Sequence, residues 1–172
     1  MSAANNSRIE RHTIAVLVDN EAGVLARVVG LFSGRGYNIE SLTVAEVDPA
    51  EHTSRITIVT SGTPEVLEQI RAQLARLVPV HQVVDLTIDK PSIQREMALV
   101  KVAGTGEKRV EAMRIAQAYF AKPVDVTHTS FIYEITGSPT KINSFIEMMQ
   151  ILGLVEVSRT GIAAISRGPE AM

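Results

Sequence analysis

The stretch TIAVLVDNEAGVLARVVGLFSGRGYNIESLTVAEV, residues 13–47, decides the fold because its hydrophobic period changes twice. Residues 13–18 are a short apolar run with β-branched side chains, which is typical of a buried strand. Residues 24–32 then place apolar side chains on one helical face. Gly34 and Gly36 end this helix, as C-terminal glycines commonly do, and residues 37–47 have the pattern of a second strand.

Three more segments complete a βαββαβ order by residue 89. Residues 54–61 alternate with the period of two that a half-buried strand requires, and residues 80–88 predict a fourth strand. Between them, Thr63 can cap a helix whose first turn accepts Pro64. The apolar stripe of that helix consists of Leu67, Ile70, Leu74 and Leu77.

The same order of elements returns after the expected linker DKPS, residues 89–92. Strands are expected at 97–104, 123–127, 130–137, 154–158 and 161–166, and helices at 107–120 and 138–152. On the first of these helices we place Val110, Met113 and Phe120 near one face. The sequence therefore predicts an α+β protein of two ferredoxin-like βαββαβ sandwiches, at 11–89 and 95–168. We expect sheet edges or helices of such small units to pair between copies or chains.

The amino-acid composition excludes several classes of protein function. The chain has no cysteine, which excludes disulfides, thiolate metal sites and cysteine nucleophiles. With a net charge of −2, the chain lacks the excess of positive charge that is typical of nucleic-acid-binding proteins. No apolar run approaches the roughly 18 residues that span a bilayer, and residues 1–11 lack the apolar centre of a secretory signal. We therefore expect no nucleic-acid or membrane partner and a cytoplasmic location.

The glycine-rich segments do not predict phosphate binding. GRGYNI follows a helix and enters a strand, whereas a dinucleotide fingerprint follows a strand and opens a helix. AGTGEKR, residues 103–109, has the better context, but it lacks both a third glycine and the ending of a P-loop. An ordinary strand-to-helix turn is the favoured interpretation there, and a small nucleotide-binding enzyme remains an alternative.

Neither a catalytic nor a metal site is predicted. The four histidines, at positions 12, 52, 81 and 128, are scattered singly, as is typical of surface or strand-end histidines. No Gly-x-Ser-x-Gly elbow occurs. Carboxylates such as Glu65 and Glu68 fall on the polar face of a helix, where solvation is sufficient.

The strand-turn-helix LVDNEAGVLARV, residues 17–28, has the composition of a small-molecule site. Free N–H groups at a helix N-terminus suit a carboxylate, and Gly23 presents no side chain to block its approach. The amide of Asn20 offers a donor and an acceptor, and Val24 and Leu25 add apolar surface. The combination suits an amino acid. On composition alone, however, Asn20 is better interpreted as a turn residue or helix cap.

Residues 19–44 resemble the N-terminal ACT domain of the small regulatory subunit of acetolactate synthase (acetohydroxyacid synthase). The likeness lies in the Asn-x-x-Gly-x-Leu element at Asn20 and in the run GYNIESL from Gly36. REMALVKV, residues 95–102, and GIAAISRG, residues 161–168, resemble the second domain of that family. The resemblance covers residues 11–169.

The resemblance implies a noncatalytic chain without cofactors of its own. In the family, the catalytic large subunit uses thiamine diphosphate, magnesium and FAD, and the small subunit activates it and confers feedback inhibition, usually by valine. Family ACT domains form homodimers with the effector at their interface. Carried over by motif, the effector-binding residues are Asn20, Gly23, Val24, Leu25, Asn38 and Ile39. A free-standing ACT-type amino-acid sensor acting on another partner remains the alternative.

Overall fold

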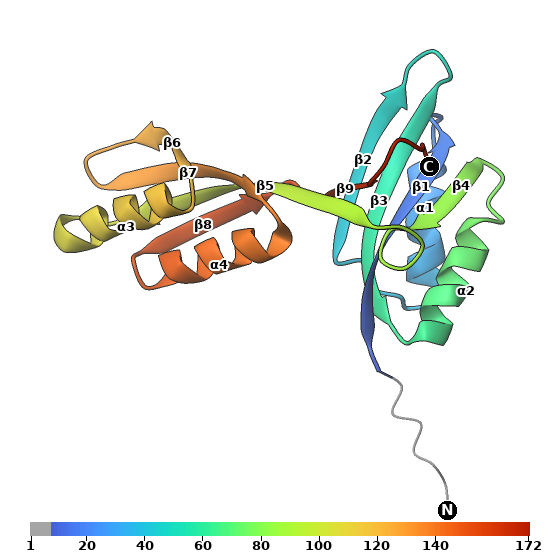
Figure 1. Ribbon diagram of the computed structural model, residues 1–172, viewed down its shortest axis with the longest axis horizontal. Helices are drawn as coiled ribbons and strands as arrows, with labels where there is room; N and C mark the ends of the chain where they lie inside the picture. Colours follow the sequence, from blue (N-terminus) through green and yellow to red (C-terminus); the bar gives the residue numbers. More distant parts are fainter. Residues whose placement is uncertain (1–7) are drawn as a thin grey trace, which may run out of the picture. The chain divides into compact units, whose positions relative to one another are not determined.

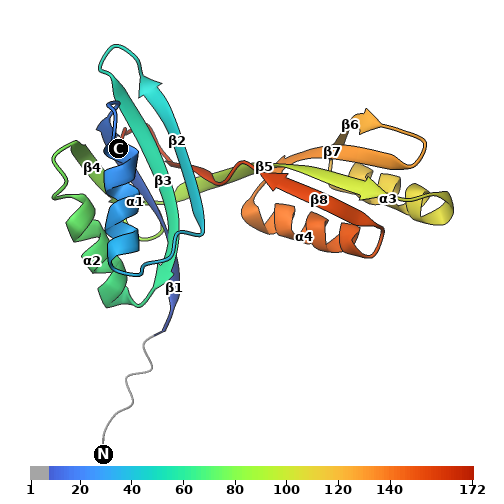
Figure 2. The ribbon, with the colours of Figure 1, turned by 180° about the vertical axis from the view of Figure 1, so that it is seen from behind.

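The structure is a computed structural model that describes residues 8–172 (Figure 1). Two compact units make up the described chain: the first contains the residues up to Ile93 together with Ile162–Met172, and the second contains Gln94–Gly161. Each unit has two helices on one face of an antiparallel sheet, and Figure 2 gives the reverse view. This arrangement confirms the predicted pair of βαββαβ sandwiches.

The first sheet has the strand order β2-β3-β1-β4. The elements of the first unit are β1 (Glu10–Asp19), α1 (Val24–Gly34), β2 (Ser41–Asp48), β3 (Thr53–Gly62), α2 (Pro64–Leu74), β4 (Val80–Asp85) and β9 (Ala163–Ser166). Ile14 lies opposite Ile58 on β3 and Asp85 on β4. The helices cover one sheet face, and the buried core between them is aliphatic apart from Phe32. The predicted stripe on α2 is buried at Leu67, Ile70 and Leu74.

Helix α1 ends in a Schellman motif at Gly36, in agreement with the sequence pattern. The Gly36 N–H donates to the Ser33 carbonyl at 3.3 Å and the Tyr37 N–H to the Phe32 carbonyl at 3.0 Å. Gly36 has φ 68°, the left-handed conformation that glycine adopts without strain. The following strand begins at Ser41, not at residue 37, so residues 37–40 form a connecting segment.

The opposite face of the first sheet is covered by the C-terminal residues. Ile162 and Ala164 pack there against a cluster of Ala15, Val59, Val84 and Leu86. Figure 1 shows this segment, which contains β9, in dark red. Residues 162–168 therefore belong to the first unit, whereas the sequence pattern places them in a domain at 95–168. The reason is that their apolar side chains complete the burial of the first sheet.

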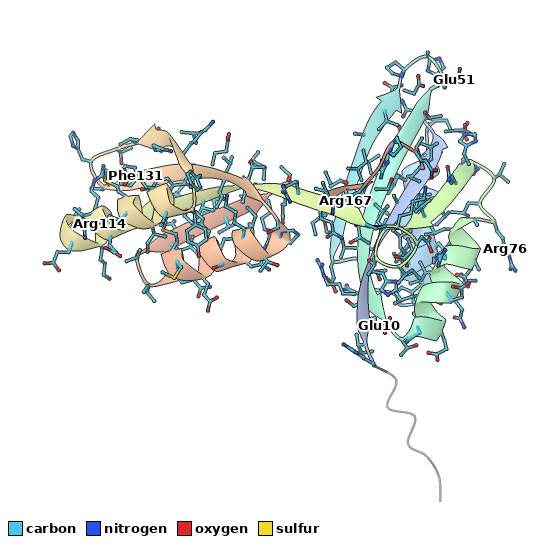
Figure 3. The ribbon with its side chains drawn as sticks, viewed as in Figure 1. Glu10, Glu51, Arg76, Arg114, Phe131 and Arg167 are labelled. Atoms are coloured by element: carbon cyan, nitrogen blue, oxygen red, sulfur yellow. The ribbon has the colours of Figure 1, made fainter. Side chains whose placement is uncertain are left out.

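The second unit has the strand order β6-β7-β5-β8, and β9 also pairs with β5. Its elements are β5 (Ser92–Ala103), α3 (Gly106–Ala118), β6 (Lys122–Val126), β7 (Ser130–Gly137), α4 (Pro139–Gln150) and β8 (Leu154–Arg159). Helix α4 buries Ile142, Phe145 and Met149. Phe131, labelled in Figure 3, packs in the same core beside Tyr133.

The predicted buried face of α3 was wrong. The helix buries Ala112, Ile115 and Ala116, whereas Val110 and Met113 are largely exposed. Small alanines let the helix lie close to the sheet, and apolar residues spread around the helix make its period ambiguous. Phe120 lies beyond the helix, 84% exposed, with φ 58°.

The end of α3 repeats the Schellman motif of α1 with phenylalanine in the place of glycine. The Phe120 N–H donates to the Gln117 carbonyl at 3.1 Å, and the Ala121 N–H to the Ala116 carbonyl at 2.8 Å. A left-handed backbone is strained for a residue with a Cβ. The same helix-ending turn is therefore unstrained in the first unit and strained in the second.

The variant Phe120→Gly should stabilise the protein. We expect a gain of about 0.5–1 kcal/mol in the free energy of unfolding, the relieved strain less the extra unfolded-state freedom of glycine. The exposed ring contributes little burial that could be lost. The matched variant Gly36→Ala should destabilise by a similar amount. Urea unfolding of both variants checks this, and a less stable Phe120→Gly would contradict it.

Candidate functional site

The turn between β1 and α1 forms the first half of the predicted site. The Asn20 N–H donates to the His52 carbonyl at 2.6 Å, which fixes the turn beside the start of β3. Gly23 is the N-cap of α1 with φ 87°, and no side chain caps the helix. The space where a Cβ of Gly23 would lie is open, and no acidic residue occupies the first turn. The positive end of α1 is therefore available to an anion.

The side chains at this turn have different environments. Asn20 is exposed, and its amide donates to Glu46 Oε1 of β2 at 3.0 Å. Leu25 is 41% exposed and offers apolar surface, but the Val24 side chain is only 3% exposed and packs in the core. Of these residues, Asn20 and Leu25 therefore have side chains that are accessible at the surface of the first unit.

The second half of the predicted site lies in the connection before β2. The Asn38 carbonyl accepts a hydrogen bond from Thr60 Oγ1 at 2.6 Å, while its side chain is exposed. Ile39 is partly buried and packs against the first core. The Glu40 N–H donates to the Val59 carbonyl at 2.8 Å. The backbone of this segment is thus anchored on β3 while Asn38 projects outward.

Glu40 is a residue that the sequence motifs do not single out. Its carboxylate accepts hydrogen bonds from Arg11 Nε at 2.7 Å and from Ser61 Oγ. The Ser61 bond, and then the Arg11 bond, hold the pKa of the Glu40 carboxyl below its usual value. The position of Glu40 directly after Ile39 is the one available signal, because its partners come from two other strands.

The two halves do not meet within one chain. Asn20 lies beside the start of β3, next to His52, whereas Asn38 is bonded to Thr60 near the end of β3. Thr60 lies seven residues along the extended strand from Thr53, a distance of about 23 Å. No single amino acid can bridge this distance, so the halves would need a second chain to form one pocket.

Comparison with known proteins gives one family model for each half of the chain. Residues 14–82 match the family model described as the AHAS small subunit-like ACT domain, and residues 95–168 match that of the small subunit of acetolactate synthase. A probable acetolactate synthase small subunit of Archaeoglobus fulgidus is 45% identical over 92% of this chain and 98% of its own. The chain belongs to the acetolactate synthase small-subunit family.

Other members of the family support this assignment. The isozyme 3 small subunit of Salmonella typhimurium is 42% identical over 94% of this chain and 99% of its own. The crystal structure of the Thermotoga maritima small subunit is 34% identical, with a TM-score of 0.82 over 94% of this chain and 99% of that one. A small subunit of acetolactate synthase implies a large catalytic partner.

The alternative nucleotide site, at residues 103–109 before α3, lacks the positive charge that would attract a polyphosphate. The hollow at the start of α3 is lined by Glu107, Lys108, Glu111 and Arg114 among others. Its two acidic and two basic side chains give no net positive charge for a polyphosphate. Gly106 has φ 60°, which explains the glycine by the turn geometry.

His12 differs from the expectation of a surface or strand-end histidine. It is 5% exposed, and its Nδ1 lies 2.6 Å from Asp85 Oδ2 while its Nε2 lies 3.2 Å from Glu10. The Asp85 contact joins β1 to the end of β4, whereas Glu10 lies on β1 itself. Among residues 8–172 no three His, Asp or Glu side chains gather as metal ligands. None of the helices in that range combines the length and the apolar character needed to span a bilayer.

The Ser61→Ala variant should raise the pKa of Glu40 towards its usual value. Because the folded-state pKa is lowered, the contact stabilises the fold fully above the unfolded-state pKa of about 4.3, and this contribution is lost as pH falls through the folded-state pKa. The effect is small, since Glu40 is partly exposed and screened.

An NMR titration of the Glu40 carboxyl measures this directly. The midpoint should move upward in Ser61→Ala, and the stability difference between variant and parent should shrink in acid. An unchanged midpoint would show that the Ser61 contact does not persist in solution.

Proposed function

We propose that this chain is the regulatory subunit of an acetolactate synthase, which activates the catalytic large subunit and makes it sensitive to feedback inhibition by a branched-chain amino acid, most simply valine. The observation that carries the proposal is the uncapped N-terminus of α1 at Gly23 beside the exposed Asn20, in a member of the small-subunit family. In this proposal the cytoplasmic holoenzyme carries thiamine diphosphate, magnesium and FAD on the large subunit, and this chain carries no cofactor.

The chemistry of the turn fits the carboxylate of an amino acid. The helix N-terminus attracts the anion, and the Asn20 amide can donate a second hydrogen bond. The exposed surface of Leu25 suits an aliphatic side chain. The ammonium group would be bound by the Asn38 side-chain oxygen and nearby carbonyls, because a desolvated charge without partners would not be stable.

A second copy of the chain would complete this pocket. β2 is an edge strand of the first sheet and pairs only with β3 among the strands described. Its start at Ser41 lies next to Asn38, and its end at Asp48 pairs with Thr53, next to the Asn20 turn. If two β2 strands pair antiparallel about a twofold axis, the start of one lies beside the end of the other. Each Asn38 then approaches the Asn20 turn of the partner.

Regulation requires only a modest coupling free energy. An effector shifts the balance between activating and inhibiting arrangements to the extent that it binds them unequally. A tenfold inhibition corresponds to about 1.4 kcal/mol, which lies in the usual range for allosteric proteins. Two or three hydrogen bonds that form in one arrangement alone are sufficient.

A free-standing amino-acid sensor with another partner is the second candidate, because the ACT unit by itself would serve that role equally. Co-purification separates the two proposals. The chain should isolate a thiamine-diphosphate-dependent large subunit and raise its acetolactate synthase activity. An unrelated partner together with unchanged synthase activity would favour the sensor.

Asn20→Ala and Asn38→Ala should each relieve valine inhibition of the reconstituted holoenzyme. We expect the valine concentration for half-inhibition to rise about tenfold or more, the cost of one lost hydrogen bond to a charged group. Activation by this chain should persist, because neither side chain packs in a core. Unchanged valine sensitivity in both variants would contradict the proposed pocket.

Glu46→Ala should have the opposite effect on valine. The carboxylate of Glu46 accepts the Asn20 amide N–H and places negative charge where the effector carboxylate would bind. Its removal should tighten valine binding about two- to fivefold, the scale of one screened charge contact. Calorimetry with Glu51→Ala as a charge-matched control, from the turn at the tip of β2 and β3 (Figure 3), measures this. Weaker binding in Glu46→Ala would instead show that Glu46 assists the ligand.

A further inference from the structure

The C-terminal strap, Ile162–Met172, is anchored on the first sheet by contacts that the effector site does not explain. Ile162 is 3% exposed and Ala164 7% exposed, and both pack in one cluster with Ala15 and Val59 of the central strands. Met172 packs against the same cluster. Ile165, which follows these anchors, is 60% exposed. The strap thus buries one set of side chains and leaves the alternating set in solvent.

Hydrogen bonds join the strap to β2 and β3. The Ile162 N–H donates to Ser41 Oγ at 3.0 Å, and Thr43 Oγ1 donates to the Ile162 carbonyl at 3.3 Å. Arg55 Nη2 donates to the Ala164 carbonyl at 2.7 Å. Two of these contacts depend on hydroxyl groups of β2, so a shift of β2 in the sheet would break or remake them.

The chain immediately before the strap is anchored in the second unit. The Thr160 N–H donates to the Met97 carbonyl of β5 at 3.0 Å, and the Met97 N–H donates to Thr160 Oγ1 at 3.1 Å. One residue, Gly161, separates this anchor from Ile162. A displacement of the strap on β2 therefore pulls directly on residues fixed to β5.

On the other side, β2 follows the proposed effector segment without interruption. Ile39 lies two residues before Ser41, and Glu40 is already hydrogen-bonded to β3. We propose that the C-terminal strap is the coupling element that transmits effector occupancy, through Ser41 and Thr43 of β2, to the second unit. The inference rests on the proposed function and adds to it a route by which the site acts on the rest of the chain.

The strap has two properties that suit this role. It is bound to β2 by a few polar contacts, so a small change in effector-bound β2 changes its affinity for the strap. It is also covalently continuous with β8, so no contact surface has to be assumed. A ligand that stabilises one strap position shifts the equilibrium only by its differential affinity for that position.

The test separates binding from inhibition in the reconstituted holoenzyme. The double variant Ser41→Ala/Thr43→Val removes the hydroxyl contacts to the strap, and Ile162→Ala loosens its buried anchor. Ile165→Ala is the matched control, with the same change at an exposed position of the strap. For each, calorimetry gives the Kd for valine and activity assays give the valine concentration for half-inhibition. Hydrogen exchange reports the protection of the Ile162 amide with and without valine.

We expect the double variant and Ile162→Ala to bind valine within about twofold of the parent but to need at least about fivefold more valine for half-inhibition, since allosteric couplings begin at that size. Ile165→Ala should behave like the parent, and valine should alter Ile162 exchange in the parent. Parent-like inhibition in both strap variants would overturn the coupling role and leave the proposed function intact. A parent chain that neither binds valine nor confers inhibition would overturn both.

Discussion

The two central strands of the first sheet, β1 and β3, are buried on both faces, and the arrangement of the first unit depends on this constraint. Residues 12–16 of β1 are buried without interruption, and β3 buries five consecutive residues from Ile56. A strand with apolar side chains on both faces cannot leave either face in water without exposing a large apolar area. Helices α1 and α2 cover one face, and the C-terminal strap covers the other.

The same strands also set the geometry of the candidate site. Because β3 is ten residues long, the turn after β1 and the connection before β2 lie near its opposite ends. A much shorter strand would bring the two segments of the predicted site together within one chain. The length required for a stable core thus agrees with the proposed function, in which two chains would share the pocket and dimer formation and effector binding would support each other.

Much of the fold could be predicted because its signals are local. Gly36 ends α1, and the side chains of Thr63 and Ser138 cap α2 and α4 as their sequence contexts indicate. The composition of the Asn20 turn alone favours a turn residue or helix cap, and the effector site stays a prediction that depends on the family motif. Local patterns cannot show which residue covers which surface. His12 is hydrogen-bonded to Asp85, which lies 73 positions later in the sequence. Ile162 is hydrogen-bonded to Ser41, which lies 121 positions earlier. Such partners are decided by the packing of the whole sheet.

The first sheet is covered on both faces and the second sheet on one, and the burial pattern along their strands reflects this difference. In β7 buried and less buried residues alternate, as they do through much of β5, so each strand has one apolar face. The other face carries groups such as Lys101 and Glu156, whose side chains pair at 2.6 Å and remain in contact with water. The continuous buried run in β1 leaves neither face of the strand exposed to water. A duplicated fold that differs in this one respect needs a single additional cover, and residues 162–172 supply it to the sheet whose central strands are buried on both faces.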